Sequence, residues 1–331
     1  MTWQDLALLG GGLGLFLFGM KQMGDGLERA AGDSLRRFLE ILTRSRFLGL
    51  LVGLVFTMVV QSSSATTVMV VGFVRAGLMD LHQAAGVIFG ANIGTTITAQ
   101  LIALQVSDAA PVLLLAGVLL HCFCRRRFLQ DLGGVLAGFG MLFLGLTLMG
   151  EAASKLRDMP EAADFLAVFA RTPVLGILAG LAVTAVIQSS SASVGLLQLL
   201  AAQGVIGLDS AIFVVMGQNI GTTVTAILAS AGGGKAARRA ALLHLLFNVF
   251  GTVLFFALVR LLPVTAWIAA LTPGNPMRQI ANAHTLFNVC SVAALLPFLD
   301  PMVRLTEALI PEARPASRRI SGRKAHPSRN A

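Results

Sequence analysis

The sequence predicts an all-α integral membrane protein made of two inverted-topology repeats, each with a re-entrant helical hairpin and a discontinuous transmembrane helix. Two observations lead to this prediction: the composition suits a lipid bilayer, and the sequence repeats itself at a fixed spacing. Hydrophobic residues make up 56% of the 331 residues and charged residues only 12%, whereas about 25% are charged in an ordinary soluble domain. A soluble protein of this size needs a more polar surface, so little of the chain is expected outside the membrane.

Apolar runs follow one another along almost the whole chain. Seven are interpreted as full spans, because most approach the ~20 residues that cross a bilayer. They lie at 6–20, 84–105, 109–124, 132–150, 210–231, 240–262 and 280–299. Four shorter runs flank two polar breaks, Gln61–Thr67 and Gln188–Ser193, and predict re-entrant hairpins over 47–79 and 174–206. Such a break is tolerated at membrane depth only where it faces protein or water.

Basic residues gather in four places, and their positions predict the orientation of the chain. Three clusters begin at Lys21, Arg125 and Lys235, and the fourth is the tail 312–331, with six basic residues and one acid. A topology with the N-terminus outside and the C-terminus inside places all four in the cytoplasm. We therefore expect a multi-pass protein of the plasma membrane, the inner membrane in a bacterium. A basic tail after an apolar stretch is first of all a retention signal, so no nucleic-acid partner is expected.

These features divide the chain into five segments. They are a first repeat over 1–124, a basic loop over 125–131, a second repeat over 132–262, an additional transmembrane helix within 263–311 and the basic cytoplasmic tail over 312–331. Two charged amphipathic stretches, 25–46 and 152–172, are expected to lie along the membrane interfaces.

The sequence matches itself without a gap when it is shifted by 127 residues. Leu48–Ala99 aligns with Leu175–Ala226, and 24 of the 52 pairs are identical. The match extends weakly into the first span, where Gly19 aligns with Gly145 at a shift of 126. The expected topology gives the first span and its partner opposite directions, so the repeats are inverted. Inverted repeats with paired broken segments are typical of transporters whose site lies near the midplane between the halves.

Both hairpin breaks contain the same pentamer, Gln-Ser-Ser-Ser-Ala, at Gln61–Ala65 and Gln188–Ala192. Each offers an amide and three hydroxyls beside the N-terminus of a short helix, where unpaired N–H groups favour an anion. Two such tips facing each other could enclose a tetrahedral oxyanion. The alternative is helix capping, for which one hydroxyl per tip suffices. The expected anion ligands are Gln61, Ser62, Ser63, Ser64, Gln188, Ser189, Ser190 and Ser191.

A second pentamer, Asn-Ile-Gly-Thr-Thr, is also present twice, at Asn92–Thr96 and Asn219–Thr223. We interpret each copy as a break in a transmembrane helix, with oxygen ligands that suit a small hard cation. The alternative is a packing face on which Gly94 and Gly221 let another helix approach closely. The expected cation ligands are Thr66, Asn92, Thr95, Thr96, Ser193, Asn219, Thr222 and Thr223.

None of these four breaks contains a charged residue or a histidine. A divalent anion is too costly to hold at the membrane midplane with neutral dipoles alone. The compensating charge is therefore expected to arrive with the substrate. This predicts cation-coupled anion transport, and oxygen ligands favour Na⁺ over a proton. No resident cofactor and no metal other than the co-transported Na⁺ is expected.

Two further motifs share the pattern His-x-x-Phe-Asn, at 244–248 and 284–288. A histidine and an asparagine four residues apart lie on one face of a helix. We expect them either to join helices by a hydrogen bond or to line a route.

The doubled motifs at matched spacing resemble the sodium/phosphate cotransporter family, meaning the type II sodium-dependent phosphate transporters and their bacterial relatives. The resemblance covers about 6–300 and extends to the His-x-x-Phe-Asn pattern. It implies sodium-driven symport of inorganic phosphate across the plasma membrane, with both hairpins contributing to the phosphate and sodium sites. The family's Gln-Ser-Ser-Ser residues correspond to Gln61–Ser64 and Gln188–Ser191.

Three other functions stay open. A transporter of another oxyanion and a phosphate exporter would use the same site chemistry, because residue types do not encode direction. An intramembrane serine hydrolase is the remote alternative, but the serines come in identical pairs, whereas a nucleophile should be single. The sequence therefore predicts no enzyme. The expected partners are inorganic phosphate, Na⁺ and the lipid bilayer, and a homo-oligomer stays open.

Overall fold

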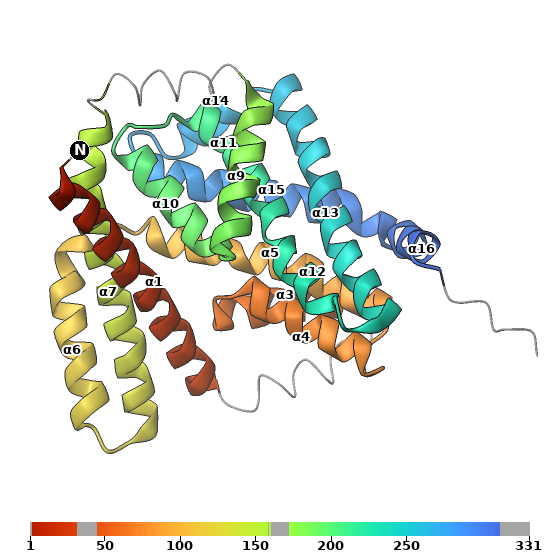
Figure 1. Ribbon diagram of the computed structural model, residues 1–331, viewed down its shortest axis with the longest axis horizontal. Helices are drawn as coiled ribbons and strands as arrows, with labels where there is room; N and C mark the ends of the chain where they lie inside the picture. Colours follow the sequence, from red (N-terminus) through yellow and green to blue (C-terminus); the bar gives the residue numbers. More distant parts are fainter. Residues whose placement is uncertain (1, 32–44, 158, 160–171, 312–331) are drawn as a thin grey trace, which may run out of the picture.

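The computed structural model describes residues 2–31, 45–157, 159 and 172–311, which form helices joined by short links (Figure 1). No strand is present in this part of the chain. The α-helices are α1 Trp3–Ala31, α3 Arg46–Val60, α4 Ser63–Arg75, α5 Leu81–Ile102, α6 Ala110–Phe123, α7 Arg127–Arg157, α9 Pro173–Ile187, α10 Ser190–Ala202, α11 Leu208–Gly221, α12 Thr223–Ser230, α13 Gly234–Leu261, α14 Val264–Leu271, α15 Pro276–Leu295 and α16 Leu299–Leu309.

Within the described residues, six helical segments are long and apolar enough to cross a membrane. They are α1, α5, α7, α11 with α12, α13, and α15 with α16. The expected seventh span, 109–124, is the 14-residue helix α6, which is short for a bilayer. The all-helical prediction is confirmed, and the composition and these helices are those of a multi-pass membrane protein.

Several expected boundaries are wrong because α1 and α7 are longer than the apolar runs within them. The basic loop expected over 125–131 is only the link 124–126, since α7 begins at Arg127. Most of the amphipathic stretches 25–46 and 152–172 lies outside the described residues. Their first parts, 25–31 and 152–157, continue α1 and α7 instead of starting separate helices. The tail 312–331 also lies outside the described residues.

The first span and its counterpart, α1 and α7, pack side by side in opposite directions (Figure 1). Glycines let the two backbones approach. A methyl group on Gly19 would lie 2.6 Å from the Gly138 carbonyl oxygen, and one on Gly145 would lie 2.6 Å from the Gly12 carbonyl oxygen. A shift of 126 residues carries Gly12 onto Gly138 and Gly19 onto Gly145, so the two contacts are equivalent.

Two ion pairs hold the ends of this helix pair. Arg29 Nε lies 3.0 Å from Asp131 Oδ1, and Lys155 Nζ contacts Asp5 Oδ1. The same shift of 126 carries Asp5 onto Asp131 and Arg29 onto Lys155. Both basic side chains are about half exposed, so solvent screens the attraction within each pair. The repeat in the sequence is thus also a repeat of contacts.

The two Asn-Ile-Gly-Thr-Thr segments pack in equivalent ways. A methyl group on Gly94 would lie 2.6 Å from the Leu54 carbonyl oxygen, and one on Gly221 would lie 2.6 Å from the Leu181 carbonyl oxygen. These glycines let α3 approach α5 and α9 approach α11. The close-packing interpretation of the two glycines is confirmed.

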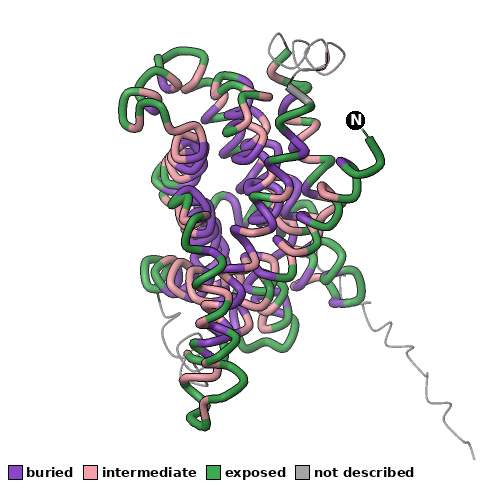
Figure 2. Tube along the Cα trace, turned by 90° about the vertical axis from the view of Figure 1, so that its left-hand side faces the viewer, coloured by how far each residue is buried: buried purple, intermediate pink, exposed green. Residues whose placement is uncertain are grey.

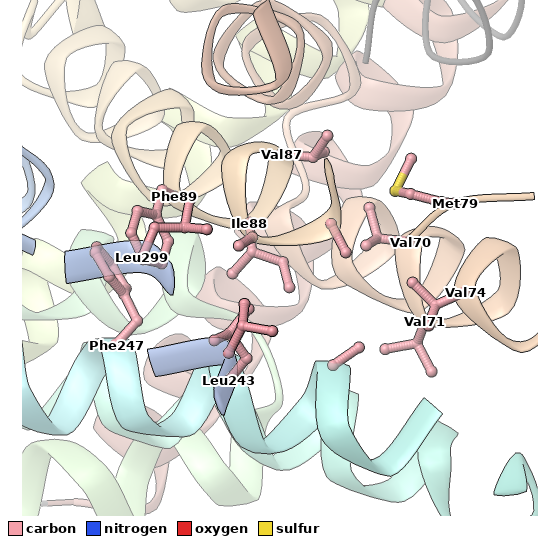
Figure 3. Packing of buried hydrophobic residues seen from close by; sticks show 14 of the residues in the cluster. Val70, Val71, Val74, Met79, Val87, Ile88, Phe89, Leu243, Phe247 and Leu299 are labelled. Carbon is pink, nitrogen blue, oxygen red and sulfur yellow. The ribbon is translucent and has the colours of Figure 1, made fainter. Parts of the chain in front are cut away.

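Two apolar cores hold the hairpins in place, and buried residues lie along the inner faces of the helices (Figure 2). Helices α4, α5, α13 and α16 meet in the first core, where Val70, Ile88 and Leu299 are almost fully buried (Figure 3). The second core joins α1, α7 and α10 and includes Phe16 and Leu197. The first hairpin therefore packs on α5 and α13. The second packs mainly on α11 and α15, and through this core it also contacts the α1–α7 pair.

Candidate functional site

The first hairpin turns at Gln61 and Ser62, between α3 and α4. Gln61 ends α3 with a left-handed backbone (φ 58°). The extended residue Ser62 caps α4, because its hydroxyl accepts a hydrogen bond from the Ala65 N–H at 3.1 Å. The break is therefore two residues long and not Gln61–Thr67, since a capped helix forms as soon as its first N–H groups are satisfied.

The second hairpin repeats this geometry. Gln188 ends α9 with φ 56°, and Ser189 caps α10 by accepting from the Ala192 N–H at 3.3 Å. Helix α10 begins at Ser190, so this break is also two residues long. The capping interpretation is thus confirmed for one serine of each tip. The other two serines of each tip do not cap a helix.

Hydroxyl pairs behind the tips are also repeated. The Oγ1 atoms of Thr57 and Thr66 lie 2.8 Å apart, and Thr184 Oγ1 donates to Ser193 Oγ at 2.8 Å. Each pair ties the first helix of a hairpin to the second. Thr66 and Ser193, both expected as cation ligands, are therefore fully buried beneath the tips.

The tip glutamines differ. Gln61 Oε1 accepts from Thr98 Oγ1 at 2.8 Å, and its amide donates to the Met58 carbonyl oxygen. Gln188 is exposed and has no side-chain hydrogen bond to the described residues. Thr225, the repeat counterpart of Thr98, donates instead to Ser64 Oγ at 3.3 Å. One contact thus crosses between the repeats, from α12 to the first tip.

Three hydroxyls in the first turns of α4 and α10 have no side-chain hydrogen bond to any described residue. They belong to Ser63, Ser190 and Ser191, whose exposed fractions are 7%, 4% and 5%. Because these hydroxyls are not committed to another side chain, each can still bind a ligand. None of the three residues is part of the lining of the cavity at the tips.

Both tips line one cavity of about 360 Å³. The first tip contributes Gln61, Ser62 and Ala65, and the second contributes Ser189. The remaining lining comes from Val60 and from one face of α1, namely Leu17, Met20, Lys21, Gly24, Asp25 and Glu28. The structure therefore brings the two predicted tips together around a shared space.

The charged residues of this cavity were missed in the sequence. Lys21 was expected in a cytoplasmic cluster after the first span, but α1 continues to Ala31 and carries it into the lining. Asp25 and Glu28 lie on the same face, since the spacing i, i+4 and i+7 repeats once per helical turn. The lining contains one basic and two acidic side chains and so no net positive charge, and the expectation that the compensating charge arrives with the substrate stays a prediction. The helical spacing of these three residues was the signal available.

The predicted helix breaks at Asn-Ile-Gly-Thr-Thr are only partly present. Helix α5 runs without a break through Asn92–Thr96, so the first discontinuity is wrong. In the second copy, α11 ends at Gly221 and α12 begins at Thr223, a break of one residue. The threonine hydroxyls of both copies donate to carbonyl oxygens three or four residues earlier in the chain. These bonds satisfy the hydroxyls without unwinding the backbone.

The two asparagines of these motifs have different surroundings. Asn92 Nδ2 donates to the Ile88 carbonyl oxygen of its own helix at 2.8 Å. Asn219 Oδ1 accepts from His284 Nε2 at 3.1 Å, and its Nδ2 donates to Asn288 Oδ1 at 2.9 Å. The second His-x-x-Phe-Asn motif thus joins α15 to α11, which confirms a helix-bridging hydrogen bond at His284.

The first His-x-x-Phe-Asn motif makes no such bridge. Asn248 donates only to the His244 carbonyl oxygen at 3.0 Å, within α13. No hydroxyl of either tip is hydrogen-bonded to a histidine among the described residues.

Two glutamines at helix contacts were also missed. Gln218 donates to the Ser193 carbonyl oxygen and hydroxyl at 2.9 and 3.0 Å. Gln198 donates to the carbonyl oxygens of Ala99 and Met277, both at 2.9 Å. Their repeat counterparts are the apolar Ala91 and Val71. The repeat was identified from positions that are identical in the two halves. These two glutamines differ between the halves and therefore gave no signal.

Comparisons with known proteins show the family of this chain. The family model described as Na+/Pi-cotransporter matches residues 15–151 and 155–272. The uncharacterized protein YqeW of Bacillus subtilis (strain 168) is 36% identical over 297 residues, which cover 89% of this chain and 95% of YqeW. No solved structure gives a significant match.

Two further relatives carry functional names. The "Putative inorganic phosphate export protein YjbB" of Escherichia coli (strain K12) is 30% identical over 296 residues, covering 89% of this chain and 54% of YjbB. The chain therefore spans about half the length of that relative. The human "Sodium-dependent phosphate transport protein 2B" is 35% identical over 150 residues, covering 44% of this chain and 20% of that protein.

The ranges matched by the family model contain both copies of Gln-Ser-Ser-Ser and of Asn-Ile-Gly-Thr-Thr. They also contain Gly19, Gly138 and Gly145 of the α1–α7 contact, whereas Gly12 lies before the first matched residue. The chain belongs to the Na+/Pi-cotransporter family, a family of phosphate and ion transport.

Proposed function

We propose that this protein is a sodium-coupled symporter of inorganic phosphate in the plasma membrane. One observation carries the proposal: the two Gln-Ser-Ser-Ser tips line a single cavity. Directly after the tip residues lie Ser63 and Ser190, two buried residues whose hydroxyls have no side-chain partner among the described residues. Hydroxyl and amide donors from two sides suit a tetrahedral oxyanion, and family membership narrows the oxyanion to phosphate.

The proposed topology is that of two inverted repeats whose hairpins re-enter the membrane from opposite sides. The antiparallel packing of α1 on α7 supports it, because the 126-residue shift relates these helices and exchanges their contacts. A site at the meeting point of two such hairpins can be exposed to either side by a symmetric movement. In the orientation set by the basic clusters, the C-terminus lies in the cytoplasm.

The proposed sodium ligands are oxygen atoms close to the tips. Thr66 and Ser193 place hydroxyl oxygens directly beneath them. Asn92 Oδ1 accepts no hydrogen bond from the described residues, whereas Asn219 Oδ1 already accepts from His284. Asn92 is therefore the stronger cation ligand of the pair. Sodium at these oxygens would supply positive charge to the phosphate site, where Lys21 is the cavity's one basic residue among those described.

The test is uptake of ³²P-phosphate into proteoliposomes with an inward Na⁺ gradient, compared with an equal K⁺ gradient. We expect uptake only with Na⁺, and competition by unlabelled phosphate stronger than by sulfate. Protein-free liposomes are the control for leakage. Uptake that ignores Na⁺, or no uptake at all, would overturn the proposal.

Phosphate export is the second candidate, because a relative that covers 89% of this chain carries that name. Import and export share the binding site and differ in the driving gradient. Vesicles preloaded with ³²P-phosphate separate them: a symporter releases phosphate faster when Na⁺ is high inside. Release that is fast without Na⁺ on either side would favour an exporter independent of sodium.

A further inference from the structure

A groove of about 510 Å³ lies between α14 and α15. None of its lining residues belongs to a hairpin tip. Three of them are polar, Thr272, Asn282 and Thr285, and the others are apolar. Two of the apolar residues, Leu271 and Val289, are exposed. Exposed apolar surface around a groove marks contact with lipid or with another protein.

The α15 side of the groove changes in chemical character along the helix axis. Arg278, Asn282, Thr285 and Val289 follow one another at i, i+4, i+7 and i+11, so they share one face of α15. This face therefore runs from a cation through two polar side chains to an apolar one. About 16 Å of helix separates Arg278 from Val289, close to half of the ~30 Å hydrocarbon core of a bilayer. A phospholipid presents its groups in the matching order: phosphate, glycerol esters and acyl chain.

The end of α15 that carries Arg278 is expected at a membrane surface. Helix α13 is long and apolar enough to cross a membrane, and it ends at Leu261. The link from there to α15 contains α14, on which Trp267 is exposed. Tryptophan is enriched where a membrane meets water. Arg278, in the first turn of α15, therefore lies at the depth of the lipid headgroups.

Hydrogen bonds connect Arg278 to the groove. Its Nη1 donates to Gln100 Oε1 of α5 at 2.9 Å. Gln100 Nε2 in turn donates to Asn282 Oδ1 at 3.2 Å and to Thr285 Oγ1 at 3.1 Å. Gln100 thus ties the guanidinium group to two of the three polar lining residues. The repeat shift of 127 carries Gln100 onto Ile227, so this network belongs to one half alone.

Arg278 makes no ion pair with the described residues. Its one side-chain hydrogen bond to them goes to a neutral amide. The sequence has no acidic residue between Asp209 and Asp300, a stretch that includes α13, α14 and α15. Asp108, in the link after α5, makes no ion pair with the described residues either. Because a guanidinium group has five N–H donors, most of those of Arg278 are available to an anion.

We propose that this groove binds one anionic phospholipid, with its phosphate at Arg278 and an acyl chain along Leu271, Leu286 and Val289. Basic pockets between transmembrane helices recognise anionic headgroups, and the planar guanidinium group matches the oxygens of a phosphate. Asn282 lies between these two ends, at the depth of the ester groups. The inference does not depend on the proposed transport, because the groove contains no residue of the tips.

A second copy of the chain is the alternative occupant of the groove. In a two-fold dimer the same face of both copies meets, and both copies have the same orientation in the membrane. Arg278 would then face its own equivalent, with no acidic residue on α14 or α15 to compensate. Charge therefore favours an anionic lipid over self-association.

The test is direct binding of lipid to the detergent-solubilised protein. Dioleoyl phosphatidylglycerol, which is anionic, and dioleoyl phosphatidylcholine, which is zwitterionic, are added in equal amounts, and native mass spectrometry gives the occupancy of each. We expect a clear preference for phosphatidylglycerol. Arg278→Gln should weaken its binding by roughly five- to tenfold, because a charge-assisted hydrogen bond is lost, and should leave phosphatidylcholine unaffected. Arg278→Lys should keep most of the preference.

Two further variants sharpen the test. Arg260→Gln is the matched control, because Arg260 is an exposed arginine in the last turn of α13 that no hydrogen bond connects to the groove among the described residues. It should bind phosphatidylglycerol like the parent protein. Val289→Trp fills the apolar part of the groove from an exposed position and should weaken binding as much as Arg278→Gln. Thermal unfolding without added lipid verifies that each variant is folded.

Equal retention of the two lipids, or equal losses in Arg278→Gln and Arg260→Gln, overturns the proposal, since any basic surface would then suffice. Unchanged binding in Val289→Trp overturns it too, because the chain would lie elsewhere. Competition by glycerol phosphate as strong as by phosphatidylglycerol would show a site for a free anion. A dimer that Val289→Trp dissociates would assign the groove to a second copy. All of these outcomes leave the proposed phosphate transport untouched.

Discussion

Asn92 and Asn219 stand in identical pentamers, yet they are held in different ways. Asn92 donates to its own helix and keeps its side-chain oxygen without a hydrogen bond from the described residues. Asn219 is fixed at both ends of its amide by His284 and Asn288 of α15. The α1–α7 pair, by contrast, keeps equivalent ion pairs and glycine contacts after the same duplication.

The difference comes from α15, which has no described counterpart packed against Asn92 in this way. This helix lies after both repeats in the chain and contacts α5, α10, α11 and α13. It contacts both halves, but among the described residues its hydrogen bonds to the asparagines of these pentamers go to Asn219 alone. Identity of a motif between repeats predicts similar backbone geometry, whereas the surroundings decide which of the two copies is free to bind.

The largest expected effect is on the stability of the second half. Asn219→Ala leaves His284 Nε2–H and Asn288 Oδ1 buried without partners, at about 1–3 kcal/mol for each group. Asn92→Ala removes only a bond to its own helix and should cost less than about 1.5 kcal/mol. Thermal unfolding of the detergent-solubilised variants measures the difference.

Asn92→Ala, the less destabilising of the two variants, should have the larger effect on the sodium dependence of phosphate uptake. If Asn92 is the cation ligand, Asn92→Ala raises the Na⁺ concentration needed for half-maximal phosphate uptake, measured per folded protein. By linkage, its phosphate affinity should also respond less to Na⁺. Asn219→Ala affecting Na⁺ dependence more strongly than Asn92→Ala would contradict the assignment.

The next largest effect is that of the tip serines on phosphate uptake. Equivalent serines of the two halves are expected to contribute equally. Ser63 and Ser190 are equivalent positions, both buried and both without a hydroxyl partner among the described residues. Removing a hydrogen bond to a charged ligand costs about 1.5–3 kcal/mol, or roughly 10- to 100-fold in affinity. We expect Ser63→Ala and Ser190→Ala to reduce uptake to a similar extent without loss of folded protein.

Ser62→Gly and Ser189→Gly change the capping positions, where glycine replaces an N-cap serine at a cost of only a few tenths of a kcal/mol. Because both serines line the tip cavity, these variants test separately whether the cap hydroxyls also bind the anion. If the alanine variants transport normally, the tips are caps and do not bind the anion. If only one of them is impaired, the anion contacts one tip and the symmetric model of the site is wrong.

The sequence predicted what depends on local composition and on the repeat. The helical class, the hairpin positions and the pairing of the two tips follow from apolar runs interrupted by identical polar pentamers. The length of the breaks did not follow, because Ser62 and Ser189 cap their helices and leave only two residues outside them. The charged lining of the cavity was missed because α1 continues beyond the apolar run, through polar residues. Gly19 and Gly26 let this part of α1 pack closely against α7.

The smallest expected effect comes from Thr98 and Thr225, identical residues that touch different parts of the first tip. Thr98 holds the Gln61 oxygen at 2.8 Å, whereas Thr225 reaches Ser64 Oγ at 3.3 Å and also bonds its own helix. Replacing either with valine keeps its shape and removes one neutral hydrogen bond, which contributes about 0.5–1.5 kcal/mol.

We expect Thr98→Val to raise the KM for phosphate by roughly two- to tenfold, because Gln61 loses the contact that orients it in the cavity. Thr225→Val should have a smaller effect, since its bond to Ser64 is long and the released serine hydroxyl can turn toward the anion. Phosphate uptake at saturating Na⁺, with KM and kcat determined separately, measures both variants. Equal effects would mean that Gln61 does not need Thr98 for its orientation. A larger effect of Thr225→Val would mean that the contact between the repeats, and not the fixed glutamine, holds the first tip in its binding geometry.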